Sequence, residues 1–163
     1  MPEVYVAAGS NVRPREYLRR ALKMLRETWP ALRVSTAYQN PAVGFEGEDF
    51  INLVAGFETD WQLPQILARL HAIEEACDRP RDAPKWAPRS MDLDVLTCGE
   101  LVGEFPGAVL PRPDLLRKPY MLGPMAELAP ELLHPTEGRS MRELWEAMGG
   151  DDTLRPVSLK EDE

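Results

Sequence analysis

Residues 85–96 of this 163-residue chain read KWAPRSMDLDVL, in which a basic segment is followed by alternating apolar and acidic residues that are typical of a β-strand. Successive side chains of a β-strand point to opposite faces of the sheet. A strand here therefore turns Leu93 and Val95 to one side, while Asp92 and Asp94 share the other. The two carboxylates stand roughly 6–7 Å apart along the strand, and near an effective dielectric of 20 they repel by about 2–3 kcal/mol. A partly closed site then requires a cation between them, either a hard divalent ion or a nearby arginine.

A basic, proline-rich segment, DRPRDAPKWAPR, precedes this strand and carries Arg79, Arg81, Lys85 and Arg89. Arginines bind phosphate oxygens with two parallel hydrogen bonds, and paired carboxylates hold the metal ions that bridge phosphates. An Asp-x-Asp pair alone is common on exposed strands. Together with the basic segment it predicts phosphate chemistry, in which two magnesium ions share the aspartates and stabilise the attacking and leaving oxygens.

Length, charge and cysteine content limit the class of protein. The length favours one domain over residues 1–150, followed by a charged, frayed tail over residues 151–163. A net charge of -8 argues against general binding to nucleic acid or anionic membranes. Cys77 and Cys98 lie outside any Cys/His cluster, which argues against zinc. Because no stretch resembles a signal peptide or a membrane span, we expect a cytoplasmic protein, and we expect a monomer.

The apolar periodicity predicts two β-α-β units. The first helix has Pro14 in its first turn, and the second follows Asp60. This order is typical of the α+β class with a ferredoxin-like, split βαβ sandwich, in which helices cover one face of an antiparallel sheet. Beyond residue 105, frequent prolines predict an additional C-terminal segment of short helices and turns. The predicted strands cover residues 3–8, 32–39, 50–59 and 91–98.

Neither GxxxxGK[ST] nor GxGxxG occurs, so side chains must bind any nucleotide. The sequence GSN at 9–11 predicts a structural turn. His71 lies one helical turn from Glu74 and is a candidate to line a site, whereas His134 is expected in a surface turn. Phe50 and Asn52 share a strand face, and an aromatic ring beside an amide suits a flat, hydrogen-bonding heterocycle.

These motifs resemble those of the 6-hydroxymethyl-7,8-dihydropterin pyrophosphokinase family over about residues 3–148. WAPRSMDLDVL resembles the family signature, and further matching segments follow in the family's order. They are VYVAAGSN, YQNPAVG at 38–44, DFINLV at 49–54, IEEACDRPR at 73–81 and LPRPDLLRKPYML at 110–122.

The resemblance implies that the protein transfers the β,γ-diphosphate of ATP to the hydroxymethyl group of the pterin, with release of AMP, in folate biosynthesis. It implies two Mg²⁺ ions on Asp92 and Asp94, and catalytic roles for Arg79 and Arg89. The ATP-binding residues that it implies are His71, Glu74, Arg81, Trp86, Arg112 and Lys118. The pterin-binding residues that it implies are Asn40, Pro41, Val43, Phe50, Asn52 and Tyr120, with Phe50 and Tyr120 stacking on the two ring faces.

The chain departs from the family pattern at three positions. Ala87 replaces the commoner glycine, and Val109 lacks a hydroxyl that some relatives use. Arg112 stands where the family usually has a histidine that touches the ATP phosphates. These departures affect how the nucleotide is bound and leave the reaction class unchanged.

The alternative hypothesis is a non-catalytic ferredoxin-like domain that binds RNA or a regulatory ligand. RNA binding requires exposed aromatic residues on central strands and a basic sheet face. The chain has neither aromatic-rich segments of that kind nor net positive charge. The sequence therefore favours the enzyme over the binding domain.

Overall fold

The computed structural model describes residues 1–41, 49–79, 90–150 and 153–160. Its main sheet is antiparallel throughout, with strand order β5-β1-β4-β3-β8, and β2 also pairs with β4. The strands are β1 (Glu3–Ser10), β2 (Arg33–Val34), β3 (Ala37–Asn40), β4 (Phe50–Glu58), β5 (Asp92–Cys98) and β8 (Arg155–Val157). A separate hairpin consists of β6 (Gly103–Phe105) and β7 (Ala108–Leu110).

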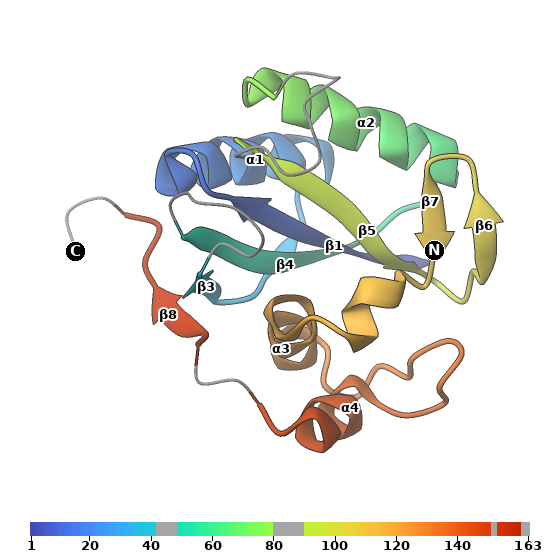
Figure 1. The fold of residues 1–163 in the computed structure, drawn as a ribbon. Helices are drawn as coiled ribbons and strands as arrows, with labels where there is room; N and C mark the ends of the chain where they lie inside the picture. Colours follow the sequence, from blue (N-terminus) through green and yellow to red (C-terminus); the bar gives the residue numbers. More distant parts are fainter. Residues whose placement is uncertain (42–48, 80–89, 151–152, 161–163) are drawn as a thin grey trace.

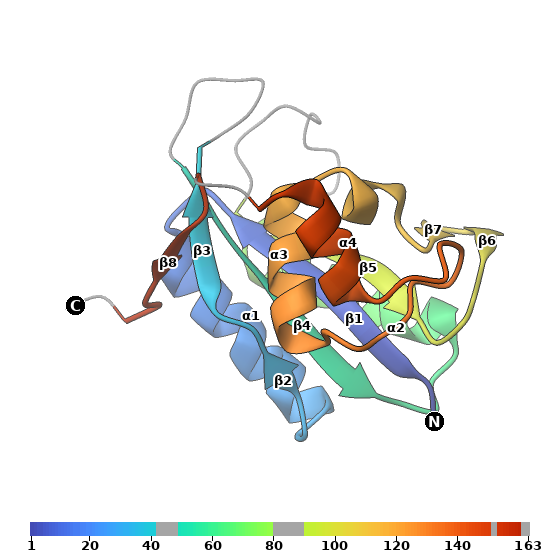
Figure 2. The ribbon, with the colours of Figure 1, turned by 90° about the horizontal axis from the view of Figure 1, so that it is seen from below.

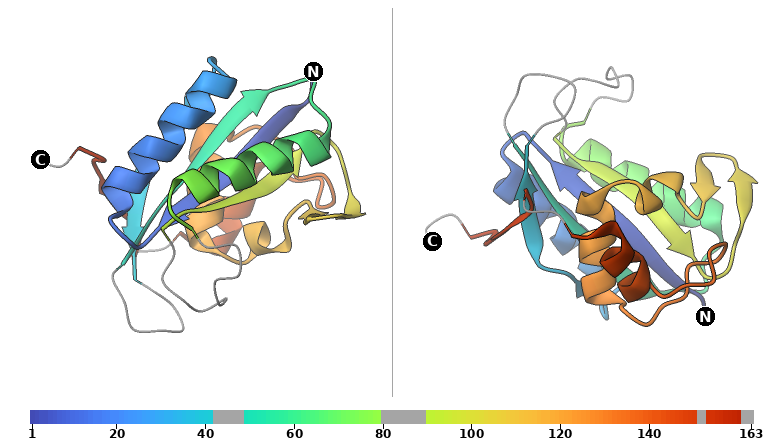
Figure 3. Two further views of the ribbon diagram at one scale, coloured as in Figure 1. Left: turned by 90° about the horizontal axis from the view of Figure 1, so that it is seen from above. Right: turned by 60° about the horizontal axis from the view of Figure 1, so that its bottom comes forward.

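Helices cover both faces of the main sheet (Figure 1). Two of them, α1 (Pro14–Thr28) and α2 (Leu63–Ala76), lie side by side on one face, as the left view of Figure 3 shows. On the other face lie α3 (Pro119–Leu128) and α4 (Met141–Met148), which cross in front of β1 and β4 in Figure 2. A short 3-10 helix, η1 (Pro113–Leu116), leads into α3.

The central strand β1 explains the two layers of helices. Its alternate residues Val4 and Val6 belong to the core under α1 and α2, whereas Tyr5 and Ala7 belong to the core under α3 and α4. All of these side chains are buried. A strand that is apolar on both faces requires cover on both. The expectation that helices cover one face is therefore wrong, while the α+β class with an antiparallel sheet is confirmed.

The predicted strands and helices are present, with three differences. The strand expected at 32–39 is divided into β2 and β3, because Ser35 and Thr36 bond to other partners: Ser35 Oγ accepts from Val54 N at 2.9 Å, and Thr36 N donates to Glu127 Oε2 at 2.8 Å. The turn expected at Gly9 is wrong, because β1 continues through Ser10.

The third difference concerns the tail. Residues 155–157 were expected to be frayed, but they form β8 on the outer edge of β3. The Arg15 Nε donates to the Ser158 carbonyl at 2.9 Å, and the Arg19 guanidinium donates to the Leu159 carbonyl. Helix α1 thus holds the segment that follows β8. None of the described helices combines the length and the apolar character that a membrane span requires.

Candidate active site

Two aspartates project from β5 toward the face that α3 covers. Leu93 and Val95 belong to the opposite core, under α1 and α2, so the predicted alternation along this strand is confirmed. Asp92 pairs in register with Gly9, and Asp94 pairs with Ala7, on the neighbouring strand β1. The carboxylates consequently lie beside the C-terminal end of the central strand β1, where two cavities meet.

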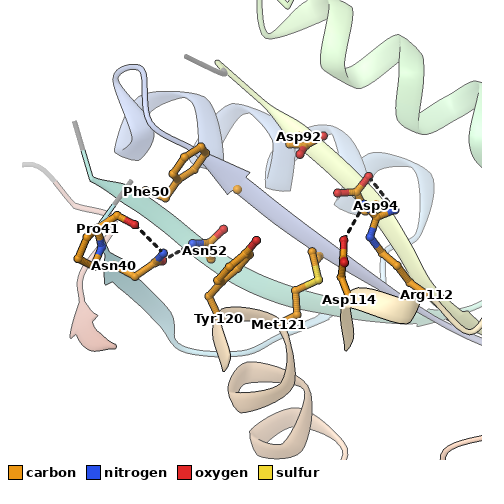
Figure 4. A pocket seen from close by; sticks show the side chains of 12 residues that line it. Asn40, Pro41, Phe50, Asn52, Asp92, Asp94, Arg112, Asp114, Tyr120 and Met121 are labelled. Carbon is orange, nitrogen blue, oxygen red and sulfur yellow. Dashed lines mark hydrogen bonds and ion pairs between the residues drawn. The ribbon is translucent and has the colours of Figure 1, made fainter. Parts of the chain in front are cut away.

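The first cavity lies between β1, β3, β4, β5 and the start of α3, and has a volume of about 150 Å³ (Figure 4). Asn52 Nδ2 donates to Asn40 Oδ1, and the Asn40 amide donates to the Pro41 carbonyl at 3.3 Å. Figure 4 shows the Phe50 and Tyr120 rings on either side of the Asn52 amide. The lining residues are Ala7, Gly9, Asn40, Pro41, Phe50, Asn52, Asp92, Asp94, Arg112, Asp114, Tyr120 and Met121.

Gly9 is required by the Asn52 amide. A Cβ atom at position 9 would lie 2.4 Å from Asn52 Oδ1, which is far below a van der Waals contact. Gly9 is cross-strand partner to Asn52 on one side and to Asp92 on the other. The absence of a side chain here therefore lets the amide lie flat against the strand, next to the carboxylates.

The second cavity lies between α2, β5 and the β6–β7 hairpin and has a volume of about 400 Å³. It shares Asp92, Asp94 and Arg112 with the first cavity. Its lining residues are Leu67, His71, Glu74, Arg79, Asp92, Leu93, Asp94, Val95, Gly107, Ala108 and Arg112. Because the carboxylates line both cavities, molecules bound in the two would meet at Asp92 and Asp94.

Arg79 connects the end of α2 to β5. Its Nη1 atom donates to Glu74 Oε2 at 2.7 Å, to Asp92 Oδ1 at 2.8 Å and to the Met91 carbonyl at 3.3 Å. The same Glu74 oxygen accepts from Leu93 N at 2.8 Å. Glu74 therefore binds both the arginine and the backbone of the strand that carries the aspartates.

Arg112 lies on the other side of the aspartates. Its Nη1 atom is 3.6 Å from Asp94 Oδ1 and its Nη2 atom is 3.4 Å from Asp114 Oδ2. The backbone N–H of Arg112 donates to the Leu96 carbonyl at 2.8 Å, which ties this residue to β5. A permanent positive charge thus faces the Asp pair.

The electrostatics of the site disfavour two bare carboxylates. Burial, and then the charge of Asp92, raise the pKa of Asp94 to about 7, although Arg112 opposes the shift. Burial also raises the pKa of Glu74, against the hydrogen bond from Leu93 N and the charge of Arg79. A divalent cation would remove the repulsion between Asp92 and Asp94, and hard carboxylate oxygens are the ligands that Mg²⁺ prefers. The residues therefore fit a magnesium site.

No group of three or more histidine, cysteine, aspartate or glutamate side chains in the described part of the chain is arranged to hold a metal ion. Two carboxylates alone leave most of the coordination positions of a magnesium ion to other oxygens. This composition is typical of sites in which substrate phosphates and water complete the coordination shell.

The structure brings most of the predicted site residues together. Those that line one or both cavities are Asn40, Pro41, Phe50, Asn52, His71, Glu74, Arg79, Asp92, Asp94, Arg112 and Tyr120. Lys118 is the N-cap residue that precedes α3, and it is not among the lining residues of either cavity. The predictions for Val43, Arg81, Trp86 and Arg89 fall outside the described residues.

Sequence reasoning missed Gly9, Gly107, Asp114 and Met121 as lining residues. The sequence predicts a turn at Gly9, and it does not indicate Asp114 because a single acidic residue among prolines has no periodic partner. The pairing of Asp114 with Arg112 is the signal that connects it to the site.

Comparison with known proteins places these features in a family context. The family model for 7,8-dihydro-6-hydroxymethylpterin-pyrophosphokinase (HPPK) matches residues 5–130. The chain is 38% identical over 146 residues to the 2-amino-4-hydroxy-6-hydroxymethyldihydropteridine pyrophosphokinase of Pseudomonas aeruginosa, covering 86% of this chain and 88% of the relative. It is 29% identical over 158 residues to the Aquifex aeolicus protein of the same name, with 96% of each chain covered.

A solved structure supports the fold. The crystal structure of wild-type Plasmodium falciparum HPPK-DHPS with STZ-DHP has a TM-score of 0.69 over 90% of this chain, at 12% identity. The match spans 41% of that longer chain. At this identity the similarity concerns the fold alone, while the family model and the curated relatives concern the reaction.

Proposed function

The chain belongs to the 7,8-dihydro-6-hydroxymethylpterin-pyrophosphokinase family, and we propose that its two adjoining cavities divide the two substrates of that reaction between them. The protein is an ATP-dependent pyrophosphokinase of folate biosynthesis, which transfers diphosphate from ATP to hydroxymethyldihydropterin. Family membership favours this enzyme over the non-catalytic alternative. The single observation that carries the proposed arrangement is that Asp92 and Asp94 line both cavities.

The pterin occupies the first cavity. The Asn52 amide supplies a donor and an acceptor to the edge of the ring, and the Asn40 amide holds Asn52 in orientation. Phe50 and Tyr120 contact the two ring faces, because their side chains lie on either side of that amide (Figure 4). Burial, followed by the charges of Asp114 and Asp92, raises the pKa of Tyr120, so its ring stays neutral beside a neutral heterocycle.

ATP occupies the second cavity. Arg79 and Arg112 flank the Asp pair and are placed to contact phosphate oxygens. His71 and Glu74 line the part of this cavity that α2 forms, which we assign to the remainder of the nucleotide. The roles of Lys118, Arg81, Trp86 and Val43 stay predictions from the family resemblance.

Two magnesium ions would be held by Asp92 and Asp94. When bound, these ions neutralise phosphate charge and stabilise the attacking and leaving oxygens of an in-line transfer. The chain's own part is to position the carboxylates on one rigid strand and to keep guanidinium groups on both sides of them. Rigid placement of this kind reduces the reorganisation that the transition state requires.

The reaction proceeds by attack of the pterin hydroxyl oxygen on the β-phosphorus of ATP. The new O–Pβ bond forms as the bond between Pβ and the oxygen bridging to Pα breaks, and AMP leaves with that oxygen. The hydroxyl proton passes to solvent water. Arg79, together with Arg89 of the basic segment, is assigned to the charge that spreads over the moving diphosphoryl group.

The strand order also supports a split βαβ arrangement, in which β1 and β3, joined through α1, lie on either side of β4, and β4 and β5, joined through α2, lie on either side of β1. We further propose a cytoplasmic monomer that does not bind nucleic acid. The net charge of -8 supports the absence of general nucleic-acid binding.

The proposed activity is tested by measuring AMP formation by chromatography. Purified protein is expected to form AMP from ATP only when magnesium and hydroxymethyldihydropterin are both present. Formation of no AMP with all three components present would overturn the proposed function.

A further inference from the structure

A third cavity, here called the distal pocket, lies on the same sheet face as the candidate active site but at the opposite ends of β1 and β5. Its volume is about 610 Å³, which suits a one-ring or two-ring organic molecule. It is bounded by the start of β1, the end of β5 and the loop between α3 and α4. The lining residues are Glu3, Tyr5, Thr97, Gly99, Glu100, Leu132, Leu133, His134, Pro135 and Gly138.

A β-bulge turns Thr97 toward this pocket. Val6 pairs with Val95, but Tyr5 pairs with Thr97, so β5 has one extra residue, Leu96, at this point. The bulge leaves Leu96 and Thr97 on the face that α3 covers. Thr97 is 2% exposed, and its hydroxyl has no hydrogen-bond partner among the described residues. A buried hydroxyl in this state costs free energy unless a ligand or solvent group bonds to it.

His134 presents a second unpartnered atom. The sequence predicted a surface turn here, but the side chain is 2% exposed, because the loop folds back around it: His134 N donates to the Arg139 carbonyl at 2.8 Å. The Nδ1 atom accepts from the backbone N–H groups of Thr136 and Glu137, both at 3.2 Å. The ring proton is therefore on Nε2. This Nε2–H group is buried without a partner in the described part of the chain.

The charges around the distal pocket select against anions. Glu3 and Glu100 contribute carboxylates, and no lysine or arginine is among the lining residues. Arg33 partly balances Glu3 from outside the pocket, with its Nη2 atom 4.0 Å from Glu3 Oε1 and bonded to the Tyr5 hydroxyl at 2.9 Å. Burial lowers the pKa of His134, with Glu137 opposing, so the imidazole is neutral at pH 7. A phosphate or carboxylate ligand would meet repulsion.

We propose that the distal pocket is a second ligand site, which binds a small neutral carboxamide or lactam. The carbonyl oxygen of such a group accepts from the His134 Nε2–H, and the Thr97 hydroxyl supplies a further hydrogen bond. The N–H of the same group donates to a carboxylate of Glu3 or Glu100. A neutral amide has an acceptor for the His134 Nε2–H group and a donor for the carboxylate of Glu3 or Glu100. A carboxylate ligand lacks the donor, and an amidinium lacks the acceptor.

Three isosteric probes test the proposal: benzamide, benzoate and benzamidinium. Each is titrated into the full chain and followed by two-dimensional ¹⁵N–¹H NMR at Thr97, Gly99 and Gly138. Benzamide is expected to shift these resonances saturably and to bind at least about fivefold more tightly than either charged probe, the difference that one hydrogen bond makes. Equal binding of all three probes would overturn the proposed chemistry. Binding of none at 10 mM would overturn the site and assign both buried groups to ordered water.

Variants separate the site from general surface binding. Thr97→Val is isosteric and is expected to weaken benzamide about fivefold while leaving pyrophosphoryl transfer unchanged. Thr28→Val, on α1, is the matched control. The Thr28 hydroxyl donates to the Met24 carbonyl at 3.2 Å and accepts from Arg69 Nε at 2.8 Å, and its loss should not alter benzamide binding. Unchanged benzamide affinity in Thr97→Val would contradict the proposal even if the probe binds.

Discussion

Arg79 and Glu74 form an ion pair with an N–O distance of 2.7 Å, and both side chains are mostly buried, at 22% and 10% exposure. The pair joins the C-terminal end of α2 to the strand that carries Asp92 and Asp94. Arg79 therefore stabilises the packing of α2 on β5 and also contacts Asp92 in the candidate active site.

Arg79→Ala is expected to destabilise the protein by about 2 kcal/mol, because it leaves Glu74 buried and without its counter-charge. Adding Glu74→Gln should restore part of this loss, since a neutral amide can still accept from Leu93 N. Urea unfolding of the single and double variants measures the effect. Equal stabilities for Arg79→Ala and Arg79→Ala/Glu74→Gln would show that the charge left on Glu74 does not destabilise the folded protein.

Asp94→Asn is expected to abolish nucleotide-dependent magnesium uptake and to lower kcat on the order of a hundredfold or more, because metal ions contribute several kcal/mol to such transfers. Isothermal calorimetry with a non-hydrolysable ATP analogue measures the uptake. Asp114→Asn is the matched control, because Asp114 lines the same cavity and contacts Arg112 but is not a proposed ligand. Retained uptake in Asp94→Asn would remove Asp94 from the metal site.

Gly9→Ala is expected to raise the KM for the pterin about tenfold and to leave the KM for ATP nearly unchanged. The added methyl group displaces the Asn52 amide, and a lost buried hydrogen bond accounts for the magnitude. Initial rates with each substrate varied separately measure the two constants. In the Gly9→Ala/Asn52→Ala double variant the two effects should not add, and full additivity would exclude a common cause.

Arg112→Ala is expected to raise the KM for ATP about tenfold, through loss of a charge-assisted phosphate contact. Arg112→His introduces a side chain whose positive charge depends on pH. Because an imidazole titrates near pH 6.5, this variant should approach the parent KM at pH 6 and resemble Arg112→Ala at pH 8. The comparison is made across a pH series of KM values. Recovery that is equal at both pH values would assign the role of Arg112 to shape instead of charge.

His134 is expected to reduce stability under acid. Burial lowers its pKa in the folded protein below the value of about 6.5 in the unfolded chain, so protonation favours unfolding. Its contribution is therefore fully present above pH 6.5 and is lost as the pH falls through the folded-state pKa. Urea midpoints from pH 8 to pH 5 should fall less steeply in His134→Asn, which does not titrate. His71→Asn removes the other histidine of the chain and assigns any change in slope to position 134.

The sequence predicts local features well because they depend on local periodicity. The alternation at 91–95 and the shared face of Phe50 and Asn52 were both correct, since a strand fixes side-chain direction every second residue. The bulge at Leu96 ends that alternation, and no local pattern predicts it. Pro14 and the apolar stripe likewise predicted α1. The same reasoning identified the Asp pair as the centre of the candidate site.

Features that depend on distant segments were not predicted. Helices on both sheet faces follow from which segments cover β1, and no local pattern states this. His134 is buried beside a pocket whose walls also include residues of β1 and β5. Gly9 is significant only because Asn52 lies on the neighbouring strand. Each of these requires the pairing of strands or loops that are far apart in sequence.

The position of β8 has a consequence for handling the protein. β3 would otherwise be the outermost strand, and residues 155–157 occupy its free hydrogen-bonding groups. Shortening the chain before residue 155, or attaching a bulky fusion partner that withdraws this strand, would leave an open edge onto which strands of other molecules can add. Self-association and precipitation would then follow from the loss of three residues that lie outside both substrate cavities.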